Sequence, residues 1–240
     1  MSLFPIFAPA SAAASVLNFV GFTASGSSGS TLENYTSTTY SSVSVGSNEG
    51  ASRIILVGAV TTGGGSGTDG LSGMTCGGVA GTKVFENLGT DHMQIAMFRY
   101  EIASGTTKDI IPTYQRSTKR GGIFVWEGTD LIFKSSSVIT RAAGSGSLTH
   151  SASFDIEAGQ AVLAMSVLAD GEERETLTFT NLTERTDVGL GPDAGSEPGA
   201  GTQVGCADAT FASASAGQSF SVEYDGTALR SSAFLVFGPS

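Results

Sequence analysis

The sequence predicts an all-β protein: an antiparallel β-sandwich of the jelly-roll or Greek-key type with an extended N-terminal arm. Three observations support this class. Apolar residues form short runs, 33 glycines and many small polar residues separate these runs, and charged residues make up only 14% of the 240 residues. An average globular domain has about 25% charged residues. Short β-forming runs between small polar residues are typical of a sheet protein with many turns.

Four runs are apolar on both faces, with Ser166 as the single interruption. The runs are 54–57, 123–126, 161–168 and 234–237. Because successive side chains of a strand point to opposite faces, such runs predict strands that are covered on both sides, as in the centre of a sandwich.

Other segments alternate between apolar and polar residues, which predicts strands with one buried face. In 219–225, Phe220, Val222 and Tyr224 share a face. The same period appears in three further segments: Ala96, Phe98, Tyr100 and Ile102; Phe154 and Ile156; Leu177 and Phe179. No long stretch has a convincing helical period, so we expect little helix.

The segment before the first strand differs from the rest of the chain. Residues 1–15 are expected to form an extended arm, and residues 16–240 a single sandwich domain. Phe4, Pro5, Ile6 and Phe7 combine apolar side chains with a backbone that proline keeps extended. We expect these four residues to dock onto another subunit; the alternative is an arm folded back along its own domain. The segment lacks the positive charges of a signal peptide, which favours a protein made in the cytoplasm and left unprocessed.

The net charge of −10 argues against nucleic-acid and anionic membrane partners. The longest apolar runs are also far shorter than the ~20 residues that span a bilayer. We therefore expect neither nucleic acid nor membrane as a partner.

One glycine pattern has the spacing of a dinucleotide-binding loop: Gly65-x-Gly67-x-x-Gly70. Such a loop must lie between a strand and the N-terminus of a helix, where the phosphates bind. A strand precedes the pattern, but a short strand, a Gly-Gly turn and another strand are predicted after it. We interpret 63–70 as a long hairpin loop and expect no bound cofactor.

The two histidines, His92 and His150, are far apart and lack neighbouring cysteines, so we interpret both as solvated loop residues and expect no metal site. The acidic segment 169–175 would suit Ca²⁺ or acid–base catalysis, but its spacing favours a solvated hairpin tip. The basic segment 116–122 would bind a phosphate, an acidic glycan or an acidic subunit, or would protect a sheet edge as a charged turn.

Cys76 and Cys206 are the only cysteines, and we expect buried free thiols rather than a disulfide, since a cytoplasmically made protein is synthesised under reducing conditions. Trp126 closes an apolar run, which favours core packing over an exposed aromatic at a glycan site. No nucleophile elbow or other catalytic constellation is present. We therefore expect a protein that is not an enzyme.

The order of the segments resembles that of small β-sandwich proteins found among the structural genes of tailed bacteriophages and prophages. The resemblance covers roughly residues 50–238 and is carried by "SRIILVGAV", "MTCGGVAGTKV", "MQIAMFRYEIASGTTKDIIPTY", "GGIFVWEG" and "SASFDIEAGQAVLAMSV", in this order. It implies a virion component, such as a decoration, a fibre or a tail appendage, and it implies no catalytic residues.

The sequence therefore predicts a non-enzymatic virion protein that contacts other virion structural proteins through its arm. We expect a homo-oligomer, with a trimer favoured. Two alternatives remain open: a module that binds host-surface glycans, and a hydrolase whose carboxylates lie in the acidic segment.

Overall fold

The computed structural model describes residues 17–25, 35–63, 70–88, 93–141, 148–171, 176–190, 201–224 and 229–240. This part of the chain contains strands and no helix, as predicted. The strands are β1 (Leu17–Ser25), β2 (Tyr35–Ser37), β3 (Tyr40–Ser44), β4 (Arg53–Gly63), β5 (Leu71–Cys76), β6 (Val79–Ala80), β7 (Thr82–Leu88), β8 (Met93–Glu101), β9 (Thr107–Thr129), β10 (Leu131–Arg141), β11 (Leu148–Ile156), β12 (Ala161–Gly171), β13 (Leu177–Thr180), β14 (Thr183–Leu190), β15 (Gly201–Thr210), β16 (Ser215–Tyr224) and β17 (Leu229–Pro239).

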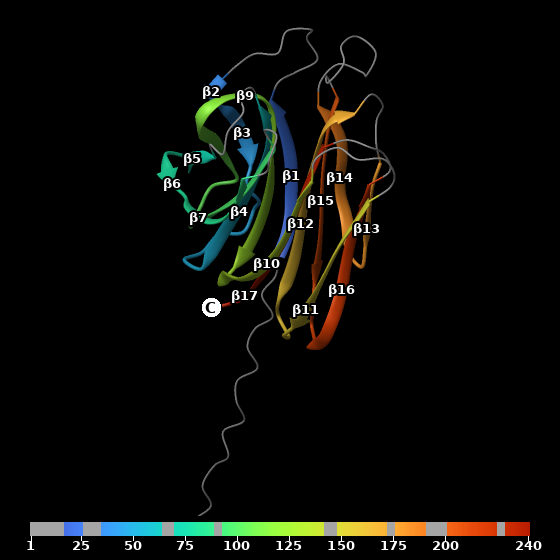
Figure 1. Cartoon of the computed structure of the whole chain (residues 1–240). Helices are drawn as coiled ribbons and strands as arrows, with labels where there is room; N and C mark the ends of the chain where they lie inside the picture. Colours follow the sequence, from blue (N-terminus) through green and yellow to red (C-terminus); the bar gives the residue numbers. More distant parts are fainter. Residues whose placement is uncertain are drawn as a thin grey trace, which may run out of the picture.

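The first nine strands, the N-terminal half of the molecule, form one antiparallel sheet. Its order is β6-β5-β9-β4-β8-β7, and β1, β2 and β3 also pair with β9. The 23 residues of β9 serve two groups of neighbours: the first part pairs with β5 and β3, and the second part pairs with β4 and β1. The sheet therefore folds over itself, with the bend in β9 visible at the upper left of Figure 1.

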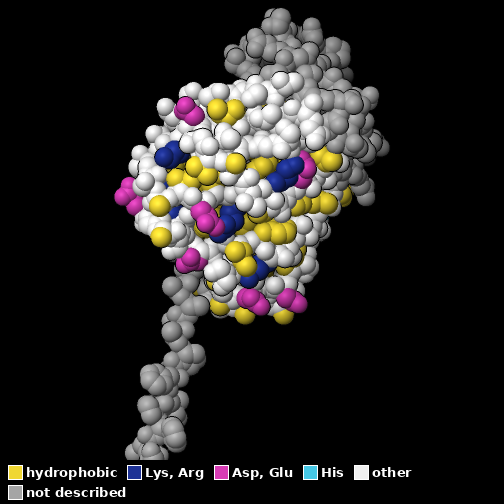
Figure 2. All heavy atoms as spheres, turned by 90° about the vertical axis from the view of Figure 1, so that its left-hand side faces the viewer, with side chains coloured by type: hydrophobic (Ala, Val, Ile, Leu, Met, Phe, Trp, Pro, Cys, Tyr) yellow, Lys and Arg dark blue, Asp and Glu magenta, His cyan; other side chains and the backbone are white. Residues whose placement is uncertain are grey.

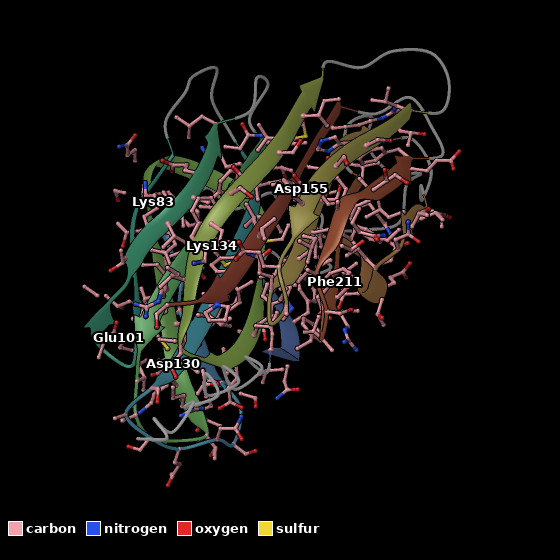
Figure 3. All side chains as sticks on the ribbon, turned by 90° about the horizontal axis from the view of Figure 1, so that it is seen from below. Lys83, Glu101, Asp130, Lys134, Asp155 and Phe211 are labelled. Atoms are coloured by element: carbon pink, nitrogen blue, oxygen red, sulfur yellow. The ribbon has the colours of Figure 1, made fainter. Side chains whose placement is uncertain are left out.

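The remaining strands form the C-terminal half, which has two antiparallel sheets. The five-stranded sheet has the order β10-β17-β12-β15-β14, and the three-stranded sheet has the order β11-β16-β13. Asp130 is the single residue between β9 and β10, so it joins the two halves. The sheets lie side by side in Figure 1, and Figure 3 shows Lys83, Lys134 and Asp155 on the nine-, five- and three-stranded sheets in turn.

Three hydrophobic cores separate the resulting four layers of strands. The N-terminal core lies inside the folded sheet and includes Ile55, Val57, Phe98, Ile110 and Val125. The C-terminal core lies between the five- and three-stranded sheets and includes Val162, Leu177, Phe220, Val222 and Phe234. The central core lies between the two halves and includes Leu56, Met97, Trp126, Leu163, Met165 and Leu235.

The four doubly apolar runs form the centres of β4, β9, β12 and β17, the strands of the two inner layers. In β4, for example, Leu56 faces the central core while Ile55 and Val57 face the N-terminal core. Each inner strand is covered on both sides, so the predicted sandwich with buried central strands is confirmed. The single domain over 16–240 stays a prediction, and the arm over residues 1–15 lies outside the described residues.

Two connections differ from their prediction as hairpins. β4 pairs with β8 and β9 in the inner layer, whereas β5 pairs with β6 and with the first part of β9 in the outer layer, so β4 and β5 do not form a hairpin. In the same way, β12 belongs to the five-stranded sheet and β13 to the three-stranded sheet. The period of the side chains shows which face of a strand is buried, but it does not show which strand is its neighbour.

Candidate functional site

The predicted docking residues Phe4, Pro5, Ile6 and Phe7 lie outside the described residues. Of the glycine pattern, only Gly70 is described; it is buried and directly precedes β5. A strand follows the pattern, as predicted, so the described residues contain no helix N-terminus that would hold a phosphate there.

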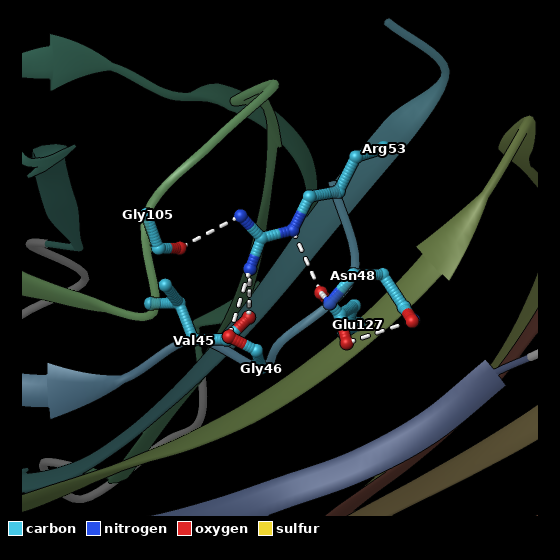
Figure 4. Close-up of polar contacts among 6 residues, drawn as sticks. All are labelled: Val45, Gly46, Asn48, Arg53, Gly105 and Glu127. Atoms are coloured by element: carbon cyan, nitrogen blue, oxygen red, sulfur yellow. Dashed lines mark hydrogen bonds and ion pairs between the residues drawn. The ribbon is translucent and has the colours of Figure 1, made fainter. Parts of the chain in front are cut away.

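The most extensive polar cluster joins β4, β9 and two loops of the N-terminal half (Figure 4). Arg53, which is 1% exposed, donates from Nε to Glu127 Oε1 at 2.7 Å. Its two other nitrogens donate to the carbonyl oxygens of Val45, Gly46 and Gly105 at 2.8–3.2 Å. One guanidinium thus fastens the β3–β4 and β8–β9 loops to the end of the sheet.

Glu127 completes this cluster from the neighbouring strand. Its carboxylate accepts hydrogen bonds from the backbone N–H of Asn48 at 3.0 Å and from Asn48 Nδ2 at 2.9 Å. Gly46 has a φ of +94°, and a Cβ there would lie 2.2 Å from Glu127 Oε2. The loop approaches the carboxylate so closely that only glycine fits. The side-chain nitrogens of Arg53 and both carboxylate oxygens of Glu127 therefore make hydrogen bonds within the cluster, which fixes the two loops.

A second cluster lies between the halves. Trp126 Nε1 donates to Asp208 Oδ2 at 2.9 Å, and the Arg185 guanidinium holds the same carboxylate at 2.8–3.1 Å. Hydrogen bonding to Asp208 raises the pKa of Arg185. Trp126 is fully buried, which confirms the predicted core packing.

The interpretation of His150 as a solvated loop residue is wrong. His150 lies in β11 and is buried; Nδ1 shares a hydrogen bond with Ser232 Oγ, and Nε2 lies 3.4 Å from Ser137 Oγ. Its ring packs on Phe234 with centroids 4.8 Å apart. Burial lowers the pKa of His150 to about 4, so the imidazole is neutral at pH 7. His92 lies outside the described residues.

The His150 group continues into the C-terminal core. Ser232 also hydrogen-bonds Tyr224, whose hydroxyl accepts from Ser166 Oγ at 2.9 Å. Burial raises the pKa of Tyr224 to about 12. The His–Ser contact resembles part of a catalytic triad, but among the described residues His150 hydrogen-bonds hydroxyls and no carboxylate that would orient it. The group is therefore a neutral buried network rather than an activated nucleophile.

The two cysteines are free and buried, as predicted. Cys76 belongs to the N-terminal core and Cys206 to the central core. Desolvation raises the pKa of Cys76 to about 11 and that of Cys206 well above its usual value. Both sulfurs are therefore protonated thiols, which are poor nucleophiles.

The charged segments are only partly described. Arg120, from the basic segment, is 4% exposed in β9, and burial lowers its pKa. Arg120 therefore lies in a buried part of a strand, whereas the segment was predicted to form a charged turn. In the acidic segment, Asp170 and Gly171 extend β12 and residues 172–175 lie outside the described part.

Within the described residues, no group of three or more His, Cys, Asp and Glu side chains is placed to hold a metal ion. The described part also lacks a helix long and apolar enough to cross a membrane. No family model, no curated protein and no solved structure matches the chain.

Proposed function

We propose that the protein is a non-enzymatic structural subunit of a tailed-bacteriophage particle, exposed on its outside as a decoration, fibre or tail-appendage protein. The strand order carries this proposal. In the C-terminal half, strands numbered one to eight from β10 to β17 form a sheet 1-8-3-6-5 and a sheet 2-7-4. Apart from strand five, which extends the first sheet beside strand six, this order agrees with that of a jelly roll and supports the proposal.

Jelly rolls build viral capsid and lectin domains. The inference from this arrangement to a virion role is an analogy between folds, and it is joined by the resemblance of the segment order to phage structural proteins.

The buried polar groups also favour a structural role. Arg53 and Glu127 fasten loops, Asp208 joins the halves, and His150 lies in a neutral network. Burial and the neighbouring Asp187 raise the pKa of the Glu184 carboxyl, but the thiol that it influences, Cys206, has a raised pKa of its own and is a poor nucleophile.

The described surface favours assembly over glycan binding. Where exposure is described, the exposed large hydrophobic side chains are the aliphatic Val79, Leu88 and Val138. An aromatic platform of the kind that stacks on sugars is not among them. Figure 2 shows charges of both signs scattered between polar and small apolar patches on the face over the outer N-terminal layer.

The ends of the chain fit an anchored subunit. Leu17, the first described residue, pairs with Gly128, and Leu131 pairs with Pro239. The N–H of Ser240 donates to the carbonyl of Asp130 at 2.9 Å. In this proposal the arm before Leu17 docks at this end of the molecule, the sandwich projects away from the contact, and the copies form a homo-oligomer, with a trimer favoured.

Mass spectrometry of heads and tails separated from purified particles tests the role. We expect the protein in one of these fractions at a fixed ratio to the major structural proteins; its absence from both overturns the proposal. Deletion of residues 2–14 tests the anchor, and the deleted protein should fold but fail to join the particle. Mass photometry of the intact protein tests the oligomer.

A further inference from the structure

We infer that residues 17–129 and 131–239 are two copies of one eight-strand unit that pack through the same face about a twofold axis. The face formed by β4, β8 and β9 is then a docking surface whose partner is a second copy of the same unit, supplied within the chain. This inference rests on strand order and packing, and it does not depend on the proposed function.

The two inner sheets have equivalent strand orders. One is β1-β9-β4-β8-β7, with the second part of β9, and the other is β10-β17-β12-β15-β14. When the two parts of β9 are counted as two strands and the short β2 and β6 are left out, each half has eight strands. Each inner sheet then places its first strand beside its last, followed by the third, the sixth and the fifth. The outer layers agree as well: β3 and β5 flank the first part of β9, and β11 and β13 flank β16.

Two β-bulges align the facing strands β8 and β15. The pairing of β7 with β8 shifts between Lys83 and Phe85, after which Phe85 pairs with Met97. The pairing of β14 with β15 shifts between Glu184 and Thr186, after which Thr186 pairs with Cys206. Bulges are specific local features, so their recurrence makes Met97 equivalent to Cys206. The bulges between β1 and β9 and between β10 and β17 also recur, and they align the last strands two residues away, with the same side chains facing the central core.

This alignment also gives the equivalent positions on the central strands β4 and β12. Met97 pairs with Gly58 on β4, and Cys206 pairs with Met165 on β12, so Gly58 and Met165 are equivalent positions. These two residues also meet across the central core: a Cβ on Gly58 would lie 2.2 Å from Met165 Sδ. A position meets its own equivalent where a twofold axis passes between the copies.

One pair of flanking contacts is reciprocal, as a twofold axis requires: β8 of the first copy packs on β17 of the second, and β15 of the second packs on β9 of the first. β8 also packs on β12, and β1 on β14, without a contact of the same extent between the equivalent strands, so the twofold symmetry is approximate. Arg99 and Asp208 occupy equivalent positions, and each makes a polar contact with the other half. Arg99 Nε donates to Leu131 O at 2.8 Å, while Asp208 accepts from Trp126.

A cleavable junction in the full-length protein tests the docking surface. A protease site is inserted at Asp130, the folded protein is cut, and size-exclusion chromatography with multi-angle light scattering follows the fragments. We expect a 1:1 complex after cutting. Gly58→Met should weaken the association of the cut halves by about tenfold or more, because two methionines then overfill the axis. Adding Met165→Gly should restore most of it.

Two controls match this experiment. Gly73→Met places the same side chain at an outer-layer glycine with nothing within 4 Å of its Cβ position, and the cut halves should stay associated. A cut in the turn 211–214, between β15 and β16, leaves fragments that share sheets of one unit. That complex should withstand Gly58→Met. Gly58→Ala serves as the milder variant if Gly58→Met does not fold.

Separation of the cut wild-type halves overturns the docking surface. Failure of Met165→Gly to restore association of the Gly58→Met halves overturns the placement of the axis. Neither result bears on whether the protein belongs to a phage particle.

Discussion

The two halves have the same strand order, but at one pair of equivalent positions they stabilise the neighbouring loops with different side chains. Arg53 lies five residues before Gly58, and Gln160 lies five residues before Met165, so the two hold equivalent positions. Arg53 fastens two loops and Glu127 with a buried charge. Gln160 instead bonds the N–H and side chain of Glu157 and accepts the N–H of Phe211 on its backbone oxygen.

The reason lies in the loops. Residues 45–52 separate β3 from β4, whereas only 157–160 separate β11 from β12. The short turn satisfies its own backbone, whereas two carbonyls of the long loop, those of Val45 and Gly46, accept hydrogen bonds from the Arg53 side chain. The comparison shows that strand order sets the frame, and that each half then satisfies its buried polar groups in its own way.

The interiors differ in a second way. Ser166 and Ser232 in the C-terminal half correspond to Ala59 and Ile123 in the N-terminal half, by the same bulge alignment. The C-terminal core therefore holds a neutral polar network, while the matching part of the N-terminal core is apolar. Four predictions use these contrasts.

The largest effect is expected at the buried charge. Glu127→Ala leaves Arg53 without its counter-ion and should lower the free energy of unfolding by about 3–5 kcal/mol. Gln160→Ala, at the equivalent of Arg53, loses neutral hydrogen bonds and should cost about 1 kcal/mol. Urea unfolding followed by tryptophan fluorescence measures both. The double variant Arg53→Met/Glu127→Leu should be less harmful than Glu127→Ala, and equal losses would contradict this explanation.

Acid should destabilise the protein through the C-terminal half. The folded pKa of His150 is about 4, below the ordinary 6.5, so the unfolded chain binds its proton more readily. This stability is present above pH 6.5 and is lost as the pH falls toward 4, by up to about 3 kcal/mol. Urea midpoints between pH 7 and 4 test it, with His150→Gln as the reference for the carboxylates that titrate in both proteins. Parallel pH profiles would count against the network.

A smaller effect is expected inside the same network. Tyr224→Phe removes the acceptor of the Ser166 hydroxyl and should cost about 1–2 kcal/mol in urea unfolding. In this variant the Ser166 hydroxyl keeps only its longer contact with the Ser231 carbonyl, at 3.4 Å. Adding Ser166→Ala removes this hydroxyl as well, so the double variant should lose less than the sum of the single variants. Strict additivity would mean that the two groups do not interact.

Alkylation of the two cysteines should show when each core opens, and it requires no substitution that would change the stability of the protein. Both thiols are buried and have raised pKa values, so neither should react with iodoacetamide at pH 8 in the folded protein. In rising urea, Cys206 reports opening of the central core and Cys76 reports unfolding of the N-terminal core. Mass spectrometry of the alkylated peptides separates the two. Rapid labelling of either residue in native buffer would contradict the packing described above.

Much of the fold could be predicted from the sequence because it depends on local patterns. The doubly apolar runs identify the inner strands, and the alternation of Phe220, Val222 and Tyr224 identifies a half-buried one. Gly77 and Gly78 both have positive φ, in agreement with the predicted turn. Layer crossings were not predictable in this way, since β4 and β5 show the same periods whether or not they pair.

The burial of His150 has a signal in the sequence: Leu148, His150 and Ala152 share one face of a strand, which places the histidine on the buried side. Arg53, in contrast, is the charged residue that opens an apolar run, and its burial depends on loops that only the folded chain brings together.

The Gly58–Met165 contact has a consequence for how this chain can change over evolutionary time. Two separate, identical copies would place the same residue twice at the axis, either leaving a gap between two glycines or crowding two methionines. A single gene that encodes both copies is free of that constraint, because each position mutates alone. The two sides of the contact can then become complementary in size, and once they have done so, neither copy can pair as well with itself as with the other.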